Sequence, residues 1–243
     1  MSSFSTPLWA PLVPKLPIRF RNTTILSVFY RSDRERIARE LPPPLEPGSD
    51  LAVAHFYHMA DPEWFGPHFE FALQLDAVLP ATDVRGAYSP LLMLTTDGGL
   101  ATGREIYGQP KKLGQPRLEV RGDLVVGVAE RNGIEAVTAT LPYKQKTAQP
   151  SELTALFPFT TNINYKFIPD IGGQPAVQQL TARSFEEVTV HECWQGDATL
   201  EVRPHAQFPA HRLPVREVVG GFYWRVDLTL PFGRVIHDYL KTE

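Results

Sequence analysis

"DLVVGVAERNGIEAVTATL" runs from Asp123 to Leu141 and decides the class of fold. Two stretches rich in valine, alanine and threonine flank Asn132-Gly133, a dipeptide that strongly favours a two-residue β-hairpin turn. Both residues of that turn need a positive φ, which asparagine tolerates and glycine adopts freely. We therefore predict two antiparallel strands over this stretch, with the turn at its centre.

Further strands are predicted on both sides of this hairpin, because their residues alternate between apolar and polar with a period of two. Prolines, 23 of 243 residues, separate these stretches as breakers between short strands do. The expected strands cover Leu51–Met59, Phe69–Leu79, Ser89–Thr96, Ser184–Trp194, Ala198–Pro204 and Phe222–Leu230. This pattern predicts a mainly β fold of the α+β kind, either an antiparallel barrel or stacked antiparallel sheets. No repeat, low-complexity tract or linker divides the chain, so we expect one domain over residues 1–243.

Two short helices are expected beside these strands. "SDRERIAREL" (Ser32–Leu41) has the spacing of a capping box, with Ser32 followed three residues later by Glu35, and it stops before Pro42. "GRVIHDYL" (Gly233–Leu240) predicts a terminal helix.

Composition excludes several classes of protein. The chain has 24 basic and 27 acidic residues and a formal net charge of −3, so it lacks the basic excess typical of nucleic-acid-binding proteins. A single cysteine, Cys193, allows no intrachain disulfide. The first residues, "MSSFSTPLWAPLVP", do not resemble a secretory signal, and no stretch approaches the ~18 apolar residues of a membrane span. We expect a cytoplasmic protein that binds neither nucleic acid nor membrane.

"GREIYGQPKKLG" (Gly103–Gly114) places two adjacent lysines, Lys111 and Lys112, in a segment with three glycines. Pro110 favours an extended conformation, in which neighbouring side chains point to opposite faces. One lysine can then face an interior while the other faces outward. Glycines are typical of places where a ligand or another stretch of backbone approaches closely. Two solvated lysines on a loop are the structural alternative.

A buried lysine has a chemical use, because a neutral amine attacks a ketone to form a Schiff base that withdraws electrons from the neighbouring carbon. At an unperturbed pKa of ~10.4, only about one lysine in 2,500 is neutral at pH 7, and a pKa of ~7 requires roughly 4.6 kcal/mol against the charged form. A second ammonium about 10 Å away supplies only about 1.7 kcal/mol at an effective dielectric near 20. Burial alone can lower a lysine pKa by about 3–5. We therefore predict that one lysine is buried in an apolar pocket and that its neighbour contributes little.

The longer segment "GREIYGQPKKLGQPRL" resembles the signature of the acetoacetate decarboxylase family, in which Gly-Arg-Glu leads into Pro-Lys-Lys-Leu. "VFYRSD" (Val28–Asp33), "EVTVHECW", "LPVREVV" and "VIHDYL" resemble further segments of that family in the same order. The resemblance covers most of the chain. It implies an antiparallel β-barrel or cone, no metal, no organic cofactor and assembly into a homo-oligomer.

The resemblance also implies roles for single residues. Lys111 would be the Schiff-base nucleophile, and the Lys112 head would turn away from the pocket. Arg31, in "FYRSD", matches an active-site arginine of the family, and Glu70, in "GPHFEF", matches an active-site glutamate. We assign Lys111, Glu70 and Arg31 to catalysis: Glu70 would move a proton to or from the imine or enamine, and Arg31 would anchor the substrate carboxylate or Glu70. A structural salt bridge is the alternative for Arg31.

Two positions depart from the family pattern. Tyr57, in "AHFYHM", stands where the decarboxylases have a second glutamate, and Gln109 stands where they have an aromatic residue. We assign Tyr57, Gln109, Arg104 and Lys112 to the substrate pocket, and an ion pair of Arg104 with Glu105 could also shape the lysine loop. A core tyrosine and a turn-stabilising amide are the structural alternatives for Tyr57 and Gln109.

Three functions follow as hypotheses. The first is a Schiff-base lyase that decarboxylates a 3-oxo acid to a ketone and carbon dioxide. The second is an aldolase-dehydratase, like other relatives on this scaffold, which condenses a 2-oxo acid such as pyruvate with an aldehyde co-substrate; the two departures favour it modestly. The third is a binding module that retains the fold without catalysis. Substrates longer than acetoacetate would fit a pocket widened by four aromatic residues, Phe56, Phe69, Phe71 and Trp64.

Overall fold

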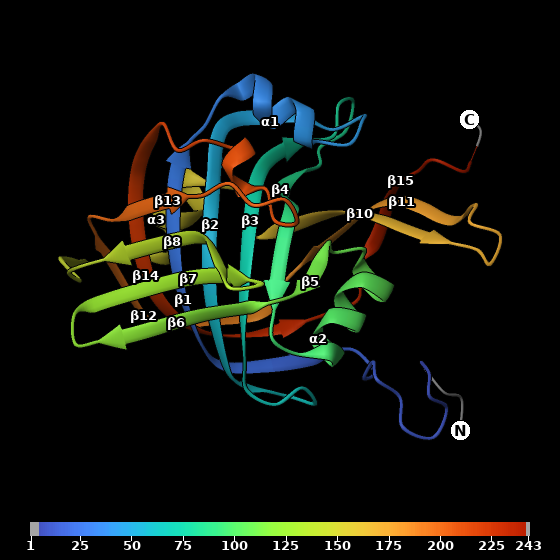
Figure 1. Ribbon diagram of the computed structural model, residues 1–243, viewed down its shortest axis with the longest axis horizontal. Coiled ribbons are helices and arrows are strands. Elements are labelled where there is room, and N and C mark those ends of the chain that lie inside the picture. The colour runs from blue at the N-terminus through green and yellow to red at the C-terminus, as the bar shows by residue number, and fades with distance from the viewer. Residues whose placement is uncertain (1–4, 242–243) are drawn as a thin grey trace.

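The computed structural model describes residues 5–241, most of which lie in two β-sheets (Figure 1). The larger sheet has eleven strands within these residues, and the smaller sheet has four. In spatial order, the larger sheet consists of β15 (Arg234–Asp238), β11 (Pro175–Ser184), β10 (Thr161–Pro169), β4 (Arg85–Leu94), β3 (His68–Val78), β2 (Glu46–Pro62), β1 (Ile18–Arg31), β14 (Glu217–Leu230), β12 (Glu186–Gly196) and β9 (Lys146–Thr147), with β5 (Lys111–Leu113) paired to β4. The smaller sheet consists of β13 (Thr199–Val202), β8 (Ile134–Leu141), β7 (Leu124–Arg131) and β6 (Gln115–Arg121).

Helical segments are short and connect the strands. They are α1 (Arg34–Glu40), α2 (Asp97–Thr102), the π-helical η1 (Gly103–Tyr107), α3 (Pro150–Leu156) and the 3₁₀-helical η2 (Ala210–Arg212). The helix predicted after Ser32 is confirmed as α1, but its N-cap is Asp33 and no side chain caps it, so the predicted capping box is wrong. Among residues 5–241, no helix is both long and apolar enough to cross a membrane.

The hairpin predicted at Asn132-Gly133 is confirmed. Strands β7 and β8 pair in antiparallel register up to Arg131 and Ile134, which flank the turn. Asn132 and Gly133 have φ values of 54° and 77°, the positive values that a two-residue turn of this kind requires. Local sequence therefore determines this part of the smaller sheet.

The predicted mainly β class with few short helices is also confirmed, with two differences in the larger sheet. Its strand order runs from β15 to β9, so the sheet is curved but not closed into a complete barrel. The sheet is also mixed, because β4 runs parallel to both β10 and β5. Helical segments α2 and η1 connect β4 to β5, and this connection lets β5 pair with β4 in parallel.

The predicted terminal helix is wrong, because residues 234–238 form strand β15. His237 pairs with Leu180 and Val235 pairs with Thr181 on β11. The apolar spacing of this segment is compatible with a helix, but the exposed edge of β11 offers backbone hydrogen-bonding partners. Tertiary pairing here overrides a local preference.

Alternating side chains on β2 and β3 cover the two faces of the larger sheet differently. Phe56 and Phe71 face the smaller sheet, and their rings pack edge to face with centroids 4.9 Å apart. Tyr57 and Glu70, one residue along each strand, point to the opposite face, where the chain encloses a cavity. One part of the core therefore lies between the sheets, and a second buried cluster lies on the opposite face of the larger sheet, where the candidate site is found.

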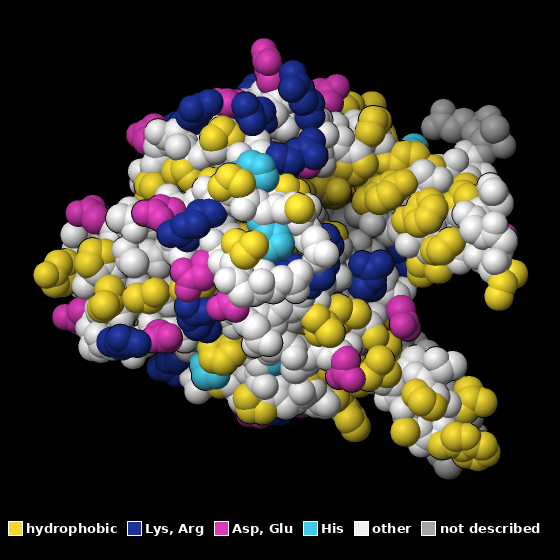
Figure 2. All heavy atoms as spheres, viewed as in Figure 1, with side chains coloured by type: hydrophobic (Ala, Val, Ile, Leu, Met, Phe, Trp, Pro, Cys, Tyr) yellow, Lys and Arg dark blue, Asp and Glu magenta, His cyan; other side chains and the backbone are white. Residues whose placement is uncertain are grey.

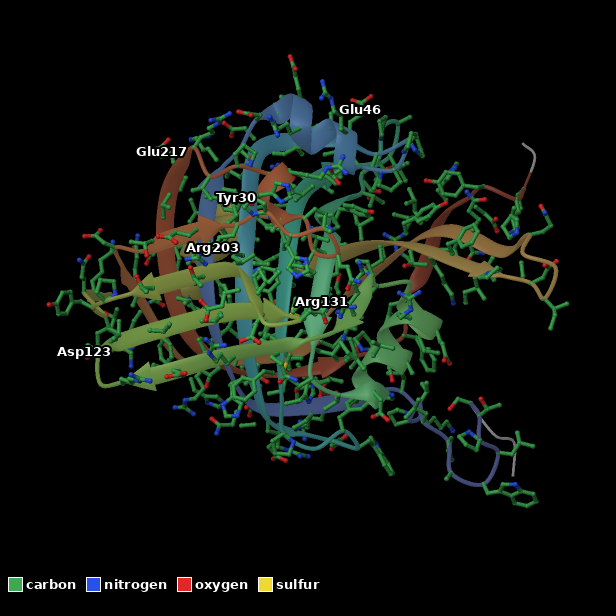
Figure 3. The ribbon with its side chains drawn as sticks, in the orientation of Figure 1. Tyr30, Glu46, Asp123, Arg131, Arg203 and Glu217 are labelled. Carbon is green, nitrogen blue, oxygen red and sulfur yellow. The ribbon has the colours of Figure 1, made fainter. Side chains whose placement is uncertain are left out.

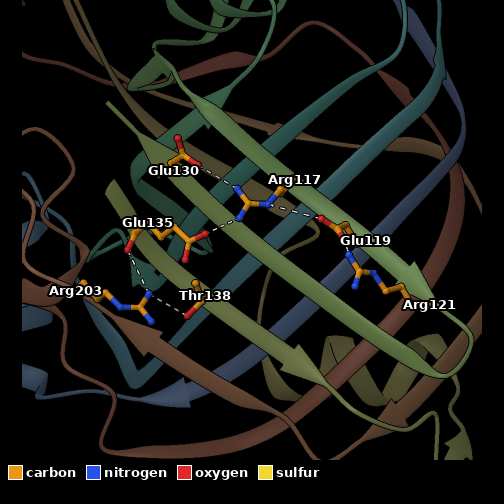
Figure 4. A network of polar contacts seen from close by, with 7 residues as sticks. All are labelled: Arg117, Glu119, Arg121, Glu130, Glu135, Thr138 and Arg203. Carbon is orange, nitrogen blue, oxygen red and sulfur yellow. Dashed lines mark hydrogen bonds and ion pairs between the residues drawn. The ribbon is translucent and has the colours of Figure 1, made fainter. Parts of the chain in front are cut away.

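The outward face of the smaller sheet carries a network of charged and polar side chains (Figure 4). Arg117 contacts Glu130 at 3.2 Å and also pairs with Glu135, while Arg203 donates to the Thr138 hydroxyl at 3.2 Å. These exposed pairs contribute little to stability individually. They cover the face of the sheet that is turned away from the core, and they take no part in the cavity.

Candidate active site

A cavity of about 60 Å³, here called the Lys111 cavity, lies on the face of the larger sheet opposite the smaller sheet. Strands β1, β2, β3, β4, β10, β11 and β14 contribute to its wall, together with α2 and η1. Most of the lining is apolar. The polar lining consists of Tyr57, His68, Glu70, Gln74, Thr102, Gln109, Lys111, Asn162 and Arg183.

Lys111 is buried in this cavity, as predicted for one lysine of the pair. Its relative exposure is 8%, and that of Glu70 is also 8%. The Lys111 ammonium donates to Glu70 Oε2 at 2.9 Å. Strand β5 places Lys111 beside Leu92 on β4, and strand β3 places Glu70 beside Leu94 on the other side of β4. A nucleophile and a proton acceptor thus meet in a site that excludes most water.

Gly103, at the start of η1, allows the chain to pass closely over the Lys111 side chain. A Cβ built at Gly103 would lie 2.4 Å from Lys111 Cδ and 2.6 Å from Cε. Gly108 serves a different purpose, because its φ is 79° and its Cα faces the backbone of Lys166 at close range. These two glycines therefore accommodate other parts of the protein around the lysine segment.

Lys112 points to the other face of β5, as predicted, and its assignment to the substrate pocket is wrong. Its ammonium donates to the backbone oxygen of Gln207 at 2.6 Å. Partial burial, and then the nearby cations Arg131 and Arg104, lower the pKa of Lys112. Arg131, labelled beside β5 in Figure 3, marks this outer side. The geometric expectation for the pair holds, with one lysine inside the cavity and one outside.

Arg31 does not reach the Lys111 cavity, so its assignment to the active site is wrong. It lies at the end of β1 near α1, about half exposed, and pairs with Asp50 at 2.6 Å and with Glu217 at 3.3 Å. Glu217 lies at the far edge of the molecule from α2 and β5 (Figures 1 and 3). The salt-bridge alternative fits Arg31, because its two carboxylate partners lie on the neighbouring strands.

Arg183, on β11, occupies the cavity instead, and sequence reasoning missed it. It is 8% exposed, and its guanidinium lies over the rings of Tyr107 and Phe185 at 5.0 and 4.4 Å from their centroids. Its Nε and Nη1 are buried without a hydrogen-bond partner among residues 5–241. Burial lowers the pKa of Arg183, while Tyr107, Glu70 and Tyr57 oppose that shift. The sequence signal was weak, because a lone arginine in a strand is ordinarily a surface residue.

The structure separates the other assigned residues. Tyr57 and the buried Gln109 line the cavity, as predicted. Burial, and then the Glu70 charge, raise the pKa of Tyr57, so its hydroxyl keeps its proton. Arg104 lies outside the cavity, where it donates to the backbone oxygen of Lys111 at 3.3 Å. Its assignment to the pocket is therefore wrong, whereas the expectation that it shapes the lysine segment agrees with this contact.

His68 is a second cavity residue to which the sequence analysis assigned no catalytic role. Its Nδ1 lies 3.0 Å from the backbone oxygen of Gly66, which can only accept a hydrogen bond. Nδ1 therefore carries the hydrogen, and Nε2 of the neutral ring is left as an acceptor. Burial lowers the pKa of His68. The site thus holds a neutral imidazole beside the lysine and the glutamate.

The charges that line the cavity favour an anionic ligand. Lys111 and Arg183 are cationic, and Glu70 is the one carboxylate among the described lining residues. Glu70 is paired with Lys111, whereas two donors of Arg183 have no partner in the part of the chain that the structure describes. A carboxylate can satisfy such donors with charge-assisted hydrogen bonds. The arrangement suits a molecule that carries both a carbonyl for the amine and a carboxylate for the guanidinium.

Comparison with known proteins agrees with this chemistry. The model of the acetoacetate decarboxylase family matches residues 3–240. A protein named acetoacetate decarboxylase from Clostridium botulinum is 35% identical over 239 residues, which cover 98% of this chain and 96% of that one. A solved structure described as a structural study of acetoacetate decarboxylase superposes with a TM-score of 0.92 at 33% identity, covering 99% of this chain and 97% of that one.

A more distant structure shares the fold alone. An enduracididine biosynthesis enzyme, solved with the condensation product of pyruvate and imidazole 4-carboxaldehyde, superposes with a TM-score of 0.81 at 21% identity. The match covers 98% of this chain and 97% of that one. The family model and these relatives cover nearly the whole chain, and they show that the chain is an enzyme of the acetoacetate decarboxylase family of carbon–carbon lyases.

Proposed function

We propose that the enzyme decarboxylates a 3-oxo acid to a ketone and carbon dioxide through an imine on Lys111. The observation that carries this proposal is the buried contact of 2.9 Å between the Lys111 ammonium and Glu70. Glu70 lies within hydrogen-bond reach to accept a proton from Lys111, and an amine that has lost this proton can attack a carbonyl. Glu70 is the acceptor for that proton.

The reaction balances with groups that line the cavity. The Lys111 amine adds to the ketone and loses water, which gives a protonated imine. The bond to the carboxylate then breaks, its electron pair moves into the imine to form an enamine, and carbon dioxide leaves. A proton returns to the enamine carbon from Glu70 or water, and hydrolysis releases the ketone and the amine. His68 Nε2 is a further acceptor within the cavity that can relay protons.

Arg183 is the group that we assign to the substrate carboxylate. Its planar guanidinium can donate two parallel hydrogen bonds, and its position between Tyr107 and Phe185 restricts its orientation. Holding the carboxylate fixes the bond that breaks relative to the imine, which lowers the entropic part of the barrier. Arg183 thereby takes the role that the sequence had assigned to Arg31.

An aldolase-dehydratase that condenses a 2-oxo acid such as pyruvate with an aldehyde is the second candidate. Tyr57 and Gln109 favour it, because both line the cavity at positions where the sequence departs from the decarboxylases. The distant enduracididine enzyme has the same fold and was solved with a condensation product of pyruvate. Lys111 would form an enamine from pyruvate, and carbon dioxide would not be released.

Borohydride trapping tests the shared covalent step. Reduction in the presence of acetoacetate should add a stable mass to Lys111, and Lys111→Ala should abolish both the adduct and turnover. Lys112→Ala is the matched control and should keep the adduct, because Lys112 points away from the cavity. An adduct that survives in Lys111→Ala would disprove the mechanism and favour a binding module.

Proton NMR separates the two reactions. Formation of acetone from acetoacetate supports decarboxylation, whereas exchange of deuterium into the methyl group of pyruvate, without release of carbon dioxide, supports the aldolase-dehydratase. Both assays use the same enzyme preparation, so a negative result in one is interpretable beside a positive result in the other.

We also propose that the chain assembles into a homo-oligomer. Apolar side chains lie on two projecting segments, near the N-terminus and at the β10–β11 turn (Figure 2). Trp9 and Ile171 are almost fully exposed there. Exposed apolar groups on projecting segments are typical of contact surfaces between subunits.

A further inference from the structure

A second cavity, of about 160 Å³, adjoins the Lys111 cavity and is larger than it. Five residues line both cavities and lie where the two adjoin: Tyr57, Gln74, Asn162, Phe185 and Leu228. The rest of the second cavity is mostly apolar and includes Leu153, Trp224 and Val226. The proposed reaction needs room only for the 3-oxo acid head, so the second cavity is left without a role.

The four aromatic residues expected to widen the pocket lie elsewhere. Phe56 and Phe71 pack between the sheets, Phe69 stacks on His58, and Trp64 is 78% exposed. Space for a substrate longer than acetoacetate therefore lies in the second cavity, on the opposite face of the sheet from Phe56 and Phe71.

His55 places one polar group in the apolar wall of the second cavity. It is 1% exposed, and its Nδ1 lies 2.8 Å from the Ser27 hydroxyl oxygen. The indole N–H of Trp224 donates to the same oxygen at 2.9 Å, so the hydroxyl hydrogen of Ser27 is available to Nδ1. In this arrangement the neutral His55 ring carries its own hydrogen on Nε2.

The Nε2 atom of His55 is buried and has no hydrogen-bond partner among residues 5–241. The Gln74 side chain interacts with His55 as a weak hydrogen-bond partner, which opposes the effect of burial on the His55 pKa, although the contact does not meet full hydrogen-bond geometry. Buried donors are ordinarily satisfied, and an unpaired one in a cavity wall is available to a ligand acceptor. His55 can therefore donate one hydrogen bond to a ligand acceptor that takes the place of Gln74.

The second cavity also reaches the surface. Pro150 and Thr154 on α3, Thr160 before β10, and Val188 on β12 line it and are exposed. The residues that line the Lys111 cavity are mostly buried. A long substrate could thus enter beside α3, place its head at Lys111 and leave its tail in the second cavity.

We infer that the second cavity binds the tail of the substrate, which is a chain-extended 3-oxo acid whose apolar tail carries one oxygen acceptor for His55. This inference rests on the proposed function, because the head of the same molecule must form the imine on Lys111. The apolar wall selects an alkyl or arylalkyl chain, and the single donor selects one ether or carbonyl oxygen along it.

Chain length gives the first test. The wild-type enzyme is assayed with acetoacetate, 3-oxohexanoate and 3-oxooctanoate, and kcat/KM should rise by about fourfold for each methylene that becomes buried. Val190→Trp, which fills the second cavity from β12, should lower the ratio of kcat/KM for 3-oxooctanoate to that for acetoacetate at least about tenfold. Val120→Trp, on the exposed face of β6, is the matched control and should leave that ratio unchanged.

The position of the acceptor gives the second test. A series of 3-oxooctanoate analogues, each with an ether oxygen in place of one methylene, should contain one isomer that the wild-type enzyme prefers over the other isomers by about tenfold. His55→Phe should abolish that preference, because phenylalanine keeps the ring shape without the N–H donor.

The outcomes separate the inference from the proposed function. Turnover of acetoacetate with no gain for longer chains overturns the tail site and leaves the decarboxylase intact. An equal loss for all substrates in Val190→Trp identifies the second cavity as an entry route and also overturns the inference. If no oxo acid is turned over or trapped, calorimetry with the same acids on Lys111→Ala decides the matter. If the affinity of Lys111→Ala for these acids rises with chain length, the tail site is supported although the decarboxylase proposal fails. If the affinity does not change with chain length, both proposals are overturned.

Discussion

Replacing Arg183 by methionine separates a substrate anchor from a structural residue. Arg183 is buried, two of its donor nitrogens have no partner among the described residues, and its guanidinium lies over two aromatic rings. Methionine has a similar length and fills the same space without charge. If Arg183 has a structural role, its replacement should mainly lower stability. If Arg183 anchors the substrate, its replacement should mainly lower kcat/KM.

The expected change in stability is small because opposing contributions nearly cancel. Each cation–π contact of Arg183 contributes about 0.5–2 kcal/mol. Each buried donor without a partner costs about 1–3 kcal/mol, and Arg183→Met removes two of them. We therefore expect the free energy of unfolding to change by less than about 2 kcal/mol.

The expected loss of activity is much larger. Removing one partner of a buried charge-assisted contact with a carboxylate costs about 2–5 kcal/mol, which corresponds to a fall in kcat/KM of about 30-fold to several thousandfold. Acetone has no carboxylate, so borohydride should still trap it on Lys111 in the Arg183→Met variant. The loss should therefore appear with oxo acids and not with the simple ketone.

Steady-state kinetics with acetoacetate, urea unfolding and trapping with acetone together provide the test. Arg183→Lys is the control, because it keeps the charge but cannot donate two parallel hydrogen bonds, and its activity should lie between that of the wild type and that of Arg183→Met. A kcat/KM for Arg183→Met within about threefold of the wild type would refute the anchor. A loss of stability of more than about 3 kcal/mol would show a structural role instead.

Three further predictions follow from other contacts. Gly103→Ala should lower stability by about 1–3 kcal/mol and reduce turnover, because its Cβ would lie 2.4 Å from Lys111 Cδ; Gly172→Ala, in an exposed turn, should leave both within error in the same urea and kinetic assays. Burial lowers the pKa of His55 to about 3, below the ~6.5 of an unfolded histidine, so its contribution to stability is complete above about pH 6.5 and falls by up to about 1.4 kcal/mol per pH unit as the pH drops toward 3. When urea unfolding is measured between about pH 5 and pH 7, the free energy of unfolding should change less steeply with pH for His55→Gln than for the wild type. Equal pH dependence in the two proteins would contradict this reasoning. Light scattering should give a mass above that of one chain, and Ile171→Asp should lower it if the projecting β10–β11 turn lies in the subunit contact; a monomeric wild type would disprove the oligomer.

The sequence by itself determined the features that depend on neighbouring residues. Asn132-Gly133 specified a hairpin, because few residues adopt two consecutive positive φ values. Pro110 and the period of two in an extended segment placed Lys111 and Lys112 on opposite faces of β5. The resemblance of "GPHFEF" to the family also identified Glu70, which the structure brings to 2.9 Å from Lys111.

Tertiary structure alone decided which arginine enters the cavity. Arg31 and Arg183 both lie in strands, and no local pattern distinguishes them. Pairing of β10 alongside β4 brings the adjacent β11, with Arg183, to the cavity, whereas Arg31 lies at the end of β1, between Asp50 on β2 and Glu217 on β14. Such placements depend on contacts between residues far apart in the chain.

The same reason explains the terminal strand and the second cavity. Residues 234–238 form a strand because β11 offers an unpaired edge. His55 lines the second cavity because strands far apart in the chain bring it close to Trp224. Local sequence fixes backbone preference and side-chain alternation through steric effects within a few residues. The identity of the neighbours across each sheet, and hence the shape and charge of a cavity, is fixed only when the whole chain has folded.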